Sequence, residues 1–490
     1  MQVVAEKPVT LRQAISKIIS EMHSVVNSRS AELLLLHERQ FQSARNLLHY
    51  LILRSKDIRN LQDELHVAGL SSLASSESHT LRQLQAILQR LGEHIDPREI
   101  STCDYYFGRE MIRSNSHLLF GEKADDEIPY LMVTFDTQFA SDYQLIKKLL
   151  QSGMNIARIN CAHDDQEAWL NMIDLVRLAS DRTGLPCKIY MDLGGPKMRT
   201  VIRENGKLVD KISLFEKQEI LMVDDVVSDP AENIVVGCEE HGLIKQLKKG
   251  NRILFDDGII EATVLEKHRT GVRLRIERVS DRKQLLRAGK GMNFPDTELR
   301  LPPLTPYDIS VLPFVAEHAD LVGYSFVRNA GDLENLQKLL SVYNKRPSII
   351  IKIETSDAVK NLPALIMQGM RDKVFGVMIA RGDLAVEIGF ERLSEIQEEI
   401  MWICEAAHVP VIWATQVLET LNKSGIATRS EITDASYAAL AECVMINKGN
   451  YVLKVIKTLN DILRRSGGHH IKKRYTFRSM QIALNYLGNS

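Results

Sequence analysis

The 490-residue sequence lacks the features that mark several classes of protein. Its six cysteines are widely scattered, with no CxxC pair and no histidine spacing that suits structural zinc, so we expect reduced and mostly packed thiols. No stretch reaches about 18 uninterrupted apolar residues, which excludes an ordinary transmembrane helix. The first residues show no basic segment followed by an apolar one, as a secretory signal would. Together these absences predict a cytoplasmic protein.

An excess of charge of one sign is also absent. Lys and Arg number 62 and Asp and Glu number 63, so the formal net charge is −1 and no electrostatic attraction to nucleic acid or to a membrane surface is implied. Apolar residues make up 44% and charged residues 26%, which is typical of a globular protein. The length suggests about three structural units.

Hydropathy periodicity divides the chain into a helical part and an α/β part. Residues 1–122 repeat apolar positions at spacings of three and four, which predicts an all-helical N-terminal extension. Residues 123–198 and 292–465 alternate short apolar runs with helical patterns, and eight such runs predict an α/β fold, a (β/α)8 TIM barrel. The runs are YLMVTF, MNIARIN, CKIYMDL, ADLVGYSF, SIIIKIE, VFGVMIA, VPVIWAT and CVMIN.

Two further segments interrupt and follow this barrel. Residues 199–291 alternate β-branched runs with turn sequences such as KGN, DDG and RTG, which predicts an inserted small β-barrel lid domain. An insertion on this side of a barrel lies over its mouth, where it can exclude water. Residues 466–490 form a basic C-terminal tail, which we interpret as a solvated segment rather than an anion-binding one.

The carboxyl ends of the expected strands are unusually polar, and in a barrel these ends meet at one mouth. In SIIIKIETSD, residues 348–357, Lys352 and Glu354 are two positions apart and therefore point to the same side of the strand. A single such pair is more often an ordinary ion pair at a strand end, so the other strands decide its meaning. They contribute Arg158, Asn160, Asp192, Ser325, Arg328, Arg381, Asp383, Thr415 and Gln416.

This set of carboxylates and cations indicates a site for an anionic substrate and a divalent metal. Glu354 and Asp383 are hard oxygen ligands on adjacent strands and suit Mg²⁺ or Mn²⁺. Lys352 could neutralise a phosphoryl group during its transfer, and Arg158 could hold phosphate oxygens in a bidentate fork. Gly382 precedes an expected short helix, whose exposed N–H groups could bind a carboxylate.

Eight stretches resemble, in order and spacing, the pyruvate kinase family. They are SGMNIARINCAH, MDLGGPKMRT, GKGMNFP, YSFVRNAGDL, IIIKIE, VMIARGDLAVEIG, VPVIWATQVLETL and ATRSEITDAS, and the resemblance covers about residues 128–465. It implies a barrel with an inserted lid that transfers the phosphoryl group of phosphoenolpyruvate to ADP, giving pyruvate and ATP, with Mg²⁺ or Mn²⁺ as cofactor.

The same resemblance implies roles for individual residues. Lys352 resembles the lysine that stabilises the phosphoryl group, and Glu354 and Asp383 resemble the metal ligands. Arg158 resembles the phosphate-binding arginine, and Thr415 resembles the threonine near the methylene carbon that is protonated to give pyruvate. Substrate binding is thereby expected from Arg158, Gly382, Asp383 and Thr415.

Several positions depart from the family pattern around its monovalent-cation site. Asn160 and Asp192 are present, but the serine position is Ala162, and the third-strand motif carries Leu193 and Lys197. These residues resemble members of the family that need no potassium. An ammonium at Lys197 could supply the charge of the missing ion, so we predict that K⁺ is not required.

The segments that correspond to the nucleotide-binding part of the family depart further from its pattern. TFDTQFAS stands where relatives carry the turn near the adenine, and MINKGNY stands where relatives carry a loop of the proton relay. Asn160 and His163 remain candidates for nucleotide binding, although a packed or solvated histidine is an equal reading of His163. No segment resembles the C-terminal effector domain of many relatives, so sugar-phosphate regulation through that domain is not expected.

Three hypotheses follow from these departures. The first is an active Mg²⁺-dependent pyruvate kinase. The second is a barrel enzyme that uses the metal and Lys352 to handle a pyruvate-like enolate without ADP. The third is a catalytically idle scaffold, against which the intact Lys352, Glu354 and Asp383 argue. A homo-oligomer is compatible with each.

Overall fold

The computed structural model describes residues 10–123, 125, 128–224, 233–238, 242–279, 285–297 and 302–467, with the backbone of 470–471 and 474–475. Most of the expected basic tail therefore lies outside the described residues. Among the residues that are described, no helix combines the length and the apolar character needed to cross a bilayer.

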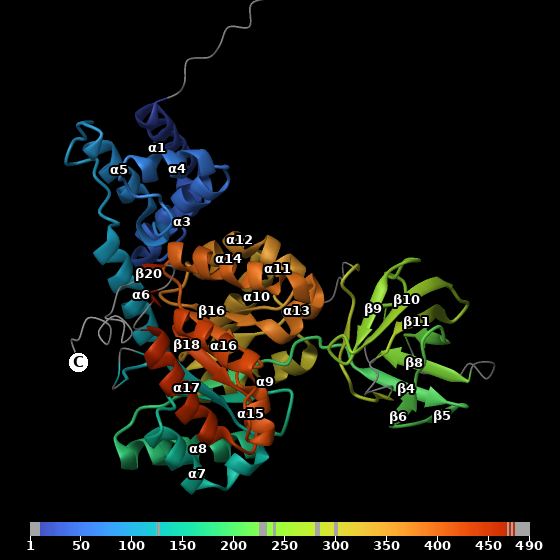
Figure 1. The fold of residues 1–490 in the computed structure, drawn as a ribbon. Coiled ribbons are helices and arrows are strands. Elements are labelled where there is room, and N and C mark those ends of the chain that lie inside the picture. Colours follow the sequence, from blue (N-terminus) through green and yellow to red (C-terminus); the bar gives the residue numbers. More distant parts are fainter. Residues whose placement is uncertain are drawn as a thin grey trace, which may run out of the picture.

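Eight parallel strands close into a barrel in the order β1-β18-β17-β16-β15-β14-β3-β2 (Figure 1). All eight apolar runs of the sequence are strands, which confirms the expected (β/α)8 barrel. The strands are β1 (Tyr130–Thr134), β2 (Ile156–Asn160), β3 (Lys188–Asp192), β14 (Leu321–Tyr324), β15 (Ser348–Ile353), β16 (Gly376–Ala380), β17 (Val411–Ala414) and β18 (Cys443–Ile446).

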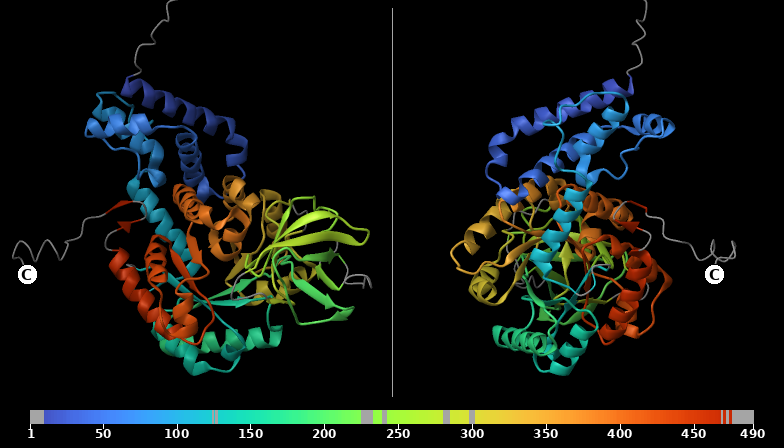
Figure 2. Two further views of the ribbon diagram at one scale, coloured as in Figure 1. Left: turned by 45° about the vertical axis from the view of Figure 1, so that its right-hand side comes forward. Right: turned by 90° about the vertical axis from the view of Figure 1, so that its left-hand side faces the viewer.

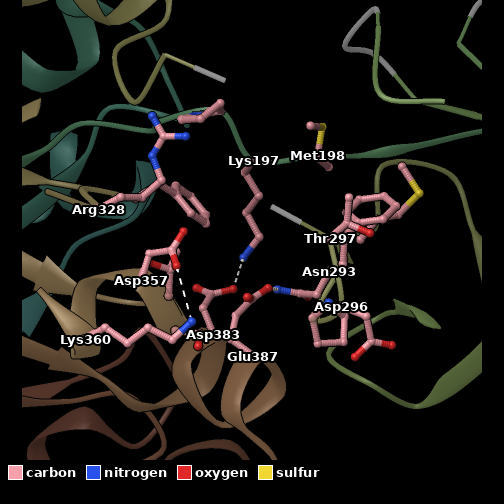
Figure 3. Close-up of a pocket in the computed structure, with 17 residues that line it drawn as sticks. Lys197, Met198, Asn293, Asp296, Thr297, Arg328, Asp357, Lys360, Asp383 and Glu387 are labelled. Atoms are coloured by element: carbon pink, nitrogen blue, oxygen red, sulfur yellow. Dashed lines mark hydrogen bonds and ion pairs between the residues drawn. The ribbon is translucent and has the colours of Figure 1, made fainter. Parts of the chain in front are cut away.

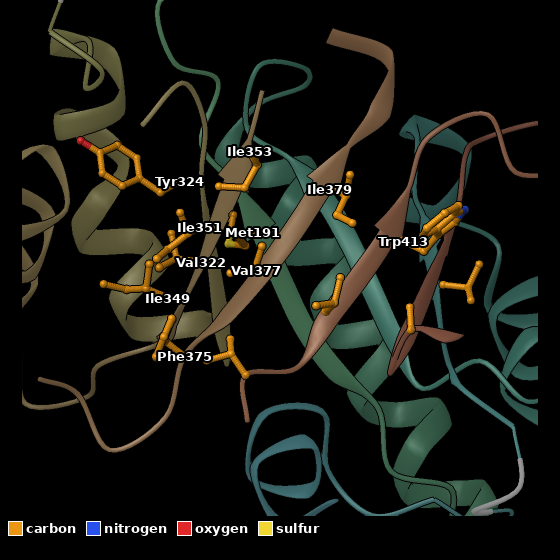
Figure 4. Close-up of a cluster of buried hydrophobic side chains, with 14 of the residues drawn as sticks. Met191, Val322, Tyr324, Ile349, Ile351, Ile353, Phe375, Val377, Ile379 and Trp413 are labelled. Carbon is orange, nitrogen blue, oxygen red and sulfur yellow. The ribbon is translucent and has the colours of Figure 1, made fainter. Parts of the chain in front are cut away.

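Helices surround this barrel on its outer face. They are α7 (Tyr143–Gln151), α8 (Gln166–Thr183), α9 (Pro306–His318), α10 (Ala330–Leu340), α11 (Ser356–Lys360), α12 (Leu362–Gly369), α13 (Arg381–Ile388), α14 (Leu393–Ala406), α15 (Glu419–Ser424), α16 (Arg429–Tyr437) and α17 (Val452–Gly467). Strand residues such as Ile351, Val377 and Trp413 face these helices and join one large apolar core (Figure 4).

Alternation along the strands decides which side chains face the barrel interior. Ile156, Tyr190 and Ile350 belong to a separate buried cluster that fills the inside of the barrel. Arg158 and Lys352 lie two residues further along their strands, so they face the same interior one layer nearer the mouth. The barrel thus ends in a polar layer above an apolar one.

The segment between β3 and α9 forms a β domain beside the barrel (Figures 1 and 2). Its strands are β4 (Thr200–Glu204), β5 (Lys207–Leu208), β6 (Lys211–Ser213), β7 (Glu219–Val223), β8 (Ile234–Cys238), β9 (Arg252–Phe255), β10 (Ile260–Lys267), β11 (Gly271–Arg278), β12 (Leu285–Arg287) and β13 (Met292–Asn293). An eight-stranded sheet in the order β13-β9-β10-β11-β7-β8-β4-β5 lies beside the pair β12-β6, and a single apolar core joins them. The order of this sheet has two ends, whereas that of the main barrel closes on itself.

The expected N-terminal helices are present and pack on the barrel. They are α1 (Leu11–Ser28), α2 (Ser30–Leu33), α3 (Phe41–Arg54), α4 (Arg59–Val67), α5 (Thr80–Arg90) and α6 (Tyr105–Phe120). At the end of α6, Leu119 and Phe120 join the cluster inside the barrel, next to Tyr130 at the start of β1. Helix α6 therefore covers the end of the barrel opposite the polar layer.

Buried hydrogen bonds fix the helical region to the barrel. The Asn46 side chain donates to the Ala406 carbonyl at 2.8 Å, and the His408 ring lies 2.9 Å from the Ser43 hydroxyl. The Asn115 side chain donates to the His408 carbonyl at 2.8 Å. Because buried polar groups are costly to leave unpaired, this interface sets one docking position for the helices.

Candidate active site

The centre of the polar layer is Lys352 on β15, which is almost fully buried. Its ammonium donates to the Ser325 hydroxyl at 2.6 Å and lies 2.9 Å from Glu354 Oε1 and 3.3 Å from Asp192 Oδ1. The structure thus places the Lys352 and Glu354 side chains together, as strand alternation predicts. Three partners from three strand ends hold one ammonium in one position.

Arg158 on β2 forms the second half of this network. Its Nε donates to Asp192 Oδ2 at 3.1 Å, its Nη2 donates to the same oxygen, and its Nη1 donates to the Thr134 hydroxyl at 3.0 Å. Asp192 therefore joins Arg158 and Lys352, with one carboxylate oxygen facing each cation. We call Arg158, Asp192, Lys352 and Glu354 the deep network.

The deep network shifts the pKa of its members in opposite directions. Burial alone lowers the pKa of Lys352, but Asp192 and Glu354 outweigh burial and raise it. Burial pushes the pKa of Asp192 up, yet Lys352 and Arg158 hold it below its ordinary value. For Glu354, burial and the nearby Asp383 charge outweigh Lys352 and raise the pKa. Lys352 thus does not fully compensate the negative charge at the buried Glu354.

This imbalance fits a divalent cation. Asp383, on α13, contacts the Lys197 ammonium through Oδ1 at 3.0 Å, and we call these two residues the rim pair (Figure 3). Among the described residues, no group of three or more His, Cys, Asp or Glu side chains is placed to hold a metal. Two carboxylates at a substrate site suit Mg²⁺, which keeps waters and takes further ligands from phosphate oxygens.

The ends of β16 and β17 are joined through Thr415. The Gly382 N–H donates to the Thr415 hydroxyl at 2.8 Å, so in this structure that N–H faces Thr415. Thr415 and Gln416 have φ values of 63° and 57°, a left-handed backbone that such residues rarely adopt. Strain of this kind is concentrated at functional sites.

Arg381 turns away from the mouth. Its Nε donates to the Ala414 carbonyl at 3.0 Å, and its guanidinium lies 4.6 Å from the centre of the Trp413 ring. The guanidinium also pairs with Asp434 on α16 and donates to the Thr415 carbonyl. Arg381 therefore braces β16 against β17, whereas Asp383, two residues further on, lines the cleft.

The residues expected to replace a monovalent-cation site are only partly brought together. Register pairs Asn160 with Asp192 on β2 and β3. The Lys197 ammonium contacts Asp383, and within the described part of the chain no hydrogen bond or ion pair joins it to Asn160 or Asp192. Leu193, next to Asp192, is buried.

His163 lies just after the end of β2 and is influenced by cationic side chains from other segments. Partial burial, Lys448 and Arg199 all lower the pKa of its imidazole. Lys448 follows β18, in the short connection that the sequence shows there, and Arg199 precedes β4. Positive charge from two other segments of the chain thus acts on His163.

A cleft of about 350 Å³ separates the stem of the inserted domain from the barrel (Figure 3). The stem contributes Lys197 and Asn293, and the barrel contributes Arg328, Asp383 and Glu387. In this cleft the Asn293 side chain donates to Glu387 Oε1 at 3.2 Å. Burial raises the pKa of Glu387 to about 6.

Two residues of this site, Tyr190 and Glu387, were not predicted from the sequence. Tyr190 lies two positions before Asp192, so the alternation that relates Lys352 to Glu354 also places it on the interior face. Glu387 follows Asp383 by one helical turn, a spacing that places both on one face of α13. Both signals are present in the sequence, although an aromatic residue in an apolar strand ordinarily indicates core packing.

Comparisons with known proteins agree on one family. The family model described as "Pyruvate kinase, barrel domain" matches residues 133–455. Pyruvate kinase of Dictyostelium discoideum is 32% identical over 69% of this chain, and that of Bacillus licheniformis is 30% identical over 69%. The cytosolic isozyme of Solanum tuberosum is 34% identical over 62%. The chain spans 66%, 57% and 58% of the lengths of these relatives, respectively.

Proposed function

The chain belongs to the pyruvate kinase family, and from this premise we propose that it transfers the phosphoryl group of phosphoenolpyruvate to ADP. In this reaction the bond between phosphorus and the enol oxygen breaks, and a bond from phosphorus to a terminal ADP oxygen forms. The enolate that is left takes a proton on its methylene carbon and becomes pyruvate.

The observation that carries this proposal is the position of Lys352. Its ammonium is buried, and Ser325, Glu354 and Asp192 hold it at the mouth of the barrel. A cation that is already fixed and desolvated stabilises the charge that spreads over a transferring phosphoryl group, at little reorganisation cost. An apolar residue would fill the same space without the cost of burying a charge beside the carboxylates of Asp192 and Glu354.

The other residues take roles that match their positions. Arg158 binds phosphate oxygens, and the Gly382 N–H and Thr415 orient the carboxylate and the methylene carbon of the substrate. A divalent cation such as Mg²⁺ or Mn²⁺, held by Glu354 and Asp383, would neutralise phosphate and carboxylate oxygens. The stem of the inserted domain lines the same cleft, where it limits access of water to the substrate.

We place the ADP phosphates near His163. Lys448 and Arg199 lie close enough to this imidazole to lower its pKa, so the region is suited to polyphosphate. The neighbouring Asn160 accepts the Ala162 N–H at 3.1 Å and orients the turn that leads to His163. Lys197 supplies a fixed positive charge near the mouth, and we propose that the reaction proceeds without K⁺.

The test is pyruvate formation from phosphoenolpyruvate with Mg²⁺, with and without ADP. We expect ADP-dependent turnover that is equal in Na⁺ and K⁺ buffers and that falls at least about a thousandfold in Lys352→Met. Lys360→Met is the matched control because Lys360 lines the same cleft, is exposed and lies 3.7 Å from Asp357. It should retain wild-type turnover.

Other outcomes identify the alternatives. Turnover that does not need ADP favours an enolate-handling enzyme, and binding of phosphoenolpyruvate without turnover favours an idle scaffold. Activity that vanishes without K⁺ contradicts the role of Lys197 while leaving phosphoryl transfer intact.

A further inference from the structure

Tyr190 is a fully buried tyrosine inside the barrel whose hydroxyl points at the deep network. The hydroxyl donates to Asp192 Oδ1 at 3.1 Å. Register places Tyr190 beside Arg158 on β2 and beside Leu321 on β14. Its ring packs in the apolar cluster inside the barrel, and its hydroxyl reaches Asp192 of the deep network.

The neighbouring strand makes room for this hydroxyl. Gly323 on β14 is paired with Asp192, and a Cβ atom at position 323 would lie 2.0 Å from the Tyr190 oxygen and 2.3 Å from Asp192 Oδ1. Since any larger residue would collide with both groups, a glycine is required for the Tyr190 to Asp192 contact. This hydrogen bond thus depends on two strands: β3 carries Tyr190 and Asp192, and β14 leaves the space at Gly323.

The hydroxyl shares its acceptor with Lys352. Asp192 Oδ1 receives Tyr190 at 3.1 Å and Lys352 at 3.3 Å, whereas Asp192 Oδ2 receives Arg158. Lys352 lies closer to Ser325, at 2.6 Å, and to Glu354, at 2.9 Å. Because Asp192 Oδ1 accepts from two donors, its interaction with the Lys352 ammonium is weaker than it would be with Lys352 alone.

We propose that Tyr190 is a positioning residue that keeps the Lys352 ammonium on the side of Glu354 and Ser325, where it meets the phosphoryl group. Without the hydroxyl, Lys352 moves toward Asp192 and away from its working position. Arg158 is bound to the other oxygen of Asp192, so substrate binding changes little. This inference rests on the proposed function only for its turnover measurement.

Tyr324 supplies a matched control. It is also a fully buried tyrosine of a barrel strand, and its hydroxyl donates to the Asp332 carbonyl at 3.2 Å, outside the deep network. Tyr190→Phe and Tyr324→Phe each remove one oxygen atom and one hydrogen bond of a fully buried tyrosine. A role in packing alone therefore predicts equal effects of the two substitutions.

We expect kcat of Tyr190→Phe to fall about tenfold, with KM for phosphoenolpyruvate changed less than about twofold. Tyr324→Phe should keep both constants, and the thermal unfolding midpoints of the two variants should agree. Crystal structures should show the distance from Lys352 Nζ to Asp192 Oδ1 shortened from 3.3 Å in Tyr190→Phe and unchanged in Tyr324→Phe.

An unchanged kcat, or an equal fall in both variants, overturns the role of Tyr190. If the wild type shows no turnover, the proposed function fails, and the crystal structures then decide the positioning role separately. An unchanged distance from Lys352 to Asp192 in Tyr190→Phe overturns it.

Discussion

The deep network and the rim pair lie at the same barrel mouth but differ in depth. The side chains of Asp192, Lys352 and Arg158 are 2%, 10% and 12% exposed, whereas those of Lys197 and Asp383 are 35% and 21% exposed. Each charge of the deep network has at least two partners. The rim pair is a single contact across the cleft.

Depth gives the two groups different energetics. A buried charge that loses its partner leaves the other charge uncompensated, which is strongly destabilising. A partly exposed pair is screened by water, and its loss costs little. The deep network therefore fixes the position of Lys352, while the rim pair can exchange its ammonium for another cation.

The largest losses of stability and activity are expected for Asp192→Asn, which removes the negative charge between Arg158 and Lys352. We expect the free energy of unfolding to fall by about 3–5 kcal/mol and kcat/KM to fall at least about a hundredfold. Denaturant unfolding followed by tryptophan fluorescence measures the stability change, because Trp169, Trp402 and Trp413 all lie in the barrel segment.

Asp357→Asn is the control for this substitution. Asp357 lines the same cleft, but its contact with Lys360 is 3.7 Å long and exposed, so its loss should cost less than about 0.5 kcal/mol. Equal losses in the two variants would show that depth does not separate the deep network from its surroundings.

Alternation explains how much of the deep network could be predicted. Lys352 and Glu354 face one side because they are two residues apart, and Arg158 and Asp192 face the same interior from neighbouring strands, two positions apart in register. The eight strands follow from apolar runs, since a barrel buries both faces of each strand. Tyr190 obeys the same rule, although its polar role depends on the space left by Gly323 on another strand.

Contacts between distant segments account for what could not be predicted. Lys197 and Asp383 are 186 positions apart, and their pairing depends on how the stem of the insert meets α13. Arg381 stands beside Asp383 in the sequence, yet it turns to Asp434 and Trp413. No local pattern distinguishes a cation that faces the cleft from one that braces two strands.

An intermediate change in stability is expected for Glu387→Gln, since Glu387 is half-buried and its side chain is bonded to a neutral amide. Its pKa is about 6 in the folded state against 4.5 for an ordinary glutamate, so the folded state binds more protons between these values. Stability therefore falls as pH rises from 4.5 through 6 and is constant above. Glutamine keeps the acceptor for Asn293 and removes this penalty.

We expect Glu387→Gln to be more stable than the wild type by about 2 kcal/mol at pH 7, with the difference vanishing toward pH 4.5. Denaturant unfolding between pH 4.5 and 8 in the presence of EDTA measures it. Glu395→Gln, at an exposed position 3.8 Å from Arg392, should show no such dependence. A constant difference across this pH range would contradict the shifted pKa.

The smallest change in stability is expected for Lys197→Met, a loss of less than about 1 kcal/mol, because the rim pair is a single, partly exposed contact.

The same substitution should strengthen the binding of Mn²⁺. The ammonium occupies Asp383 Oδ1, an oxygen that we assign to the metal, so its removal should tighten Mn²⁺ binding to the free protein by about threefold to tenfold. Titration calorimetry with Mn²⁺ alone measures this without turnover. Lys360→Met removes the same charge at the same cleft and should leave the Mn²⁺ affinity within about twofold of the wild type. Weaker Mn²⁺ binding in Lys197→Met would mean that Lys197 holds Asp383 in place for the metal instead of competing with it.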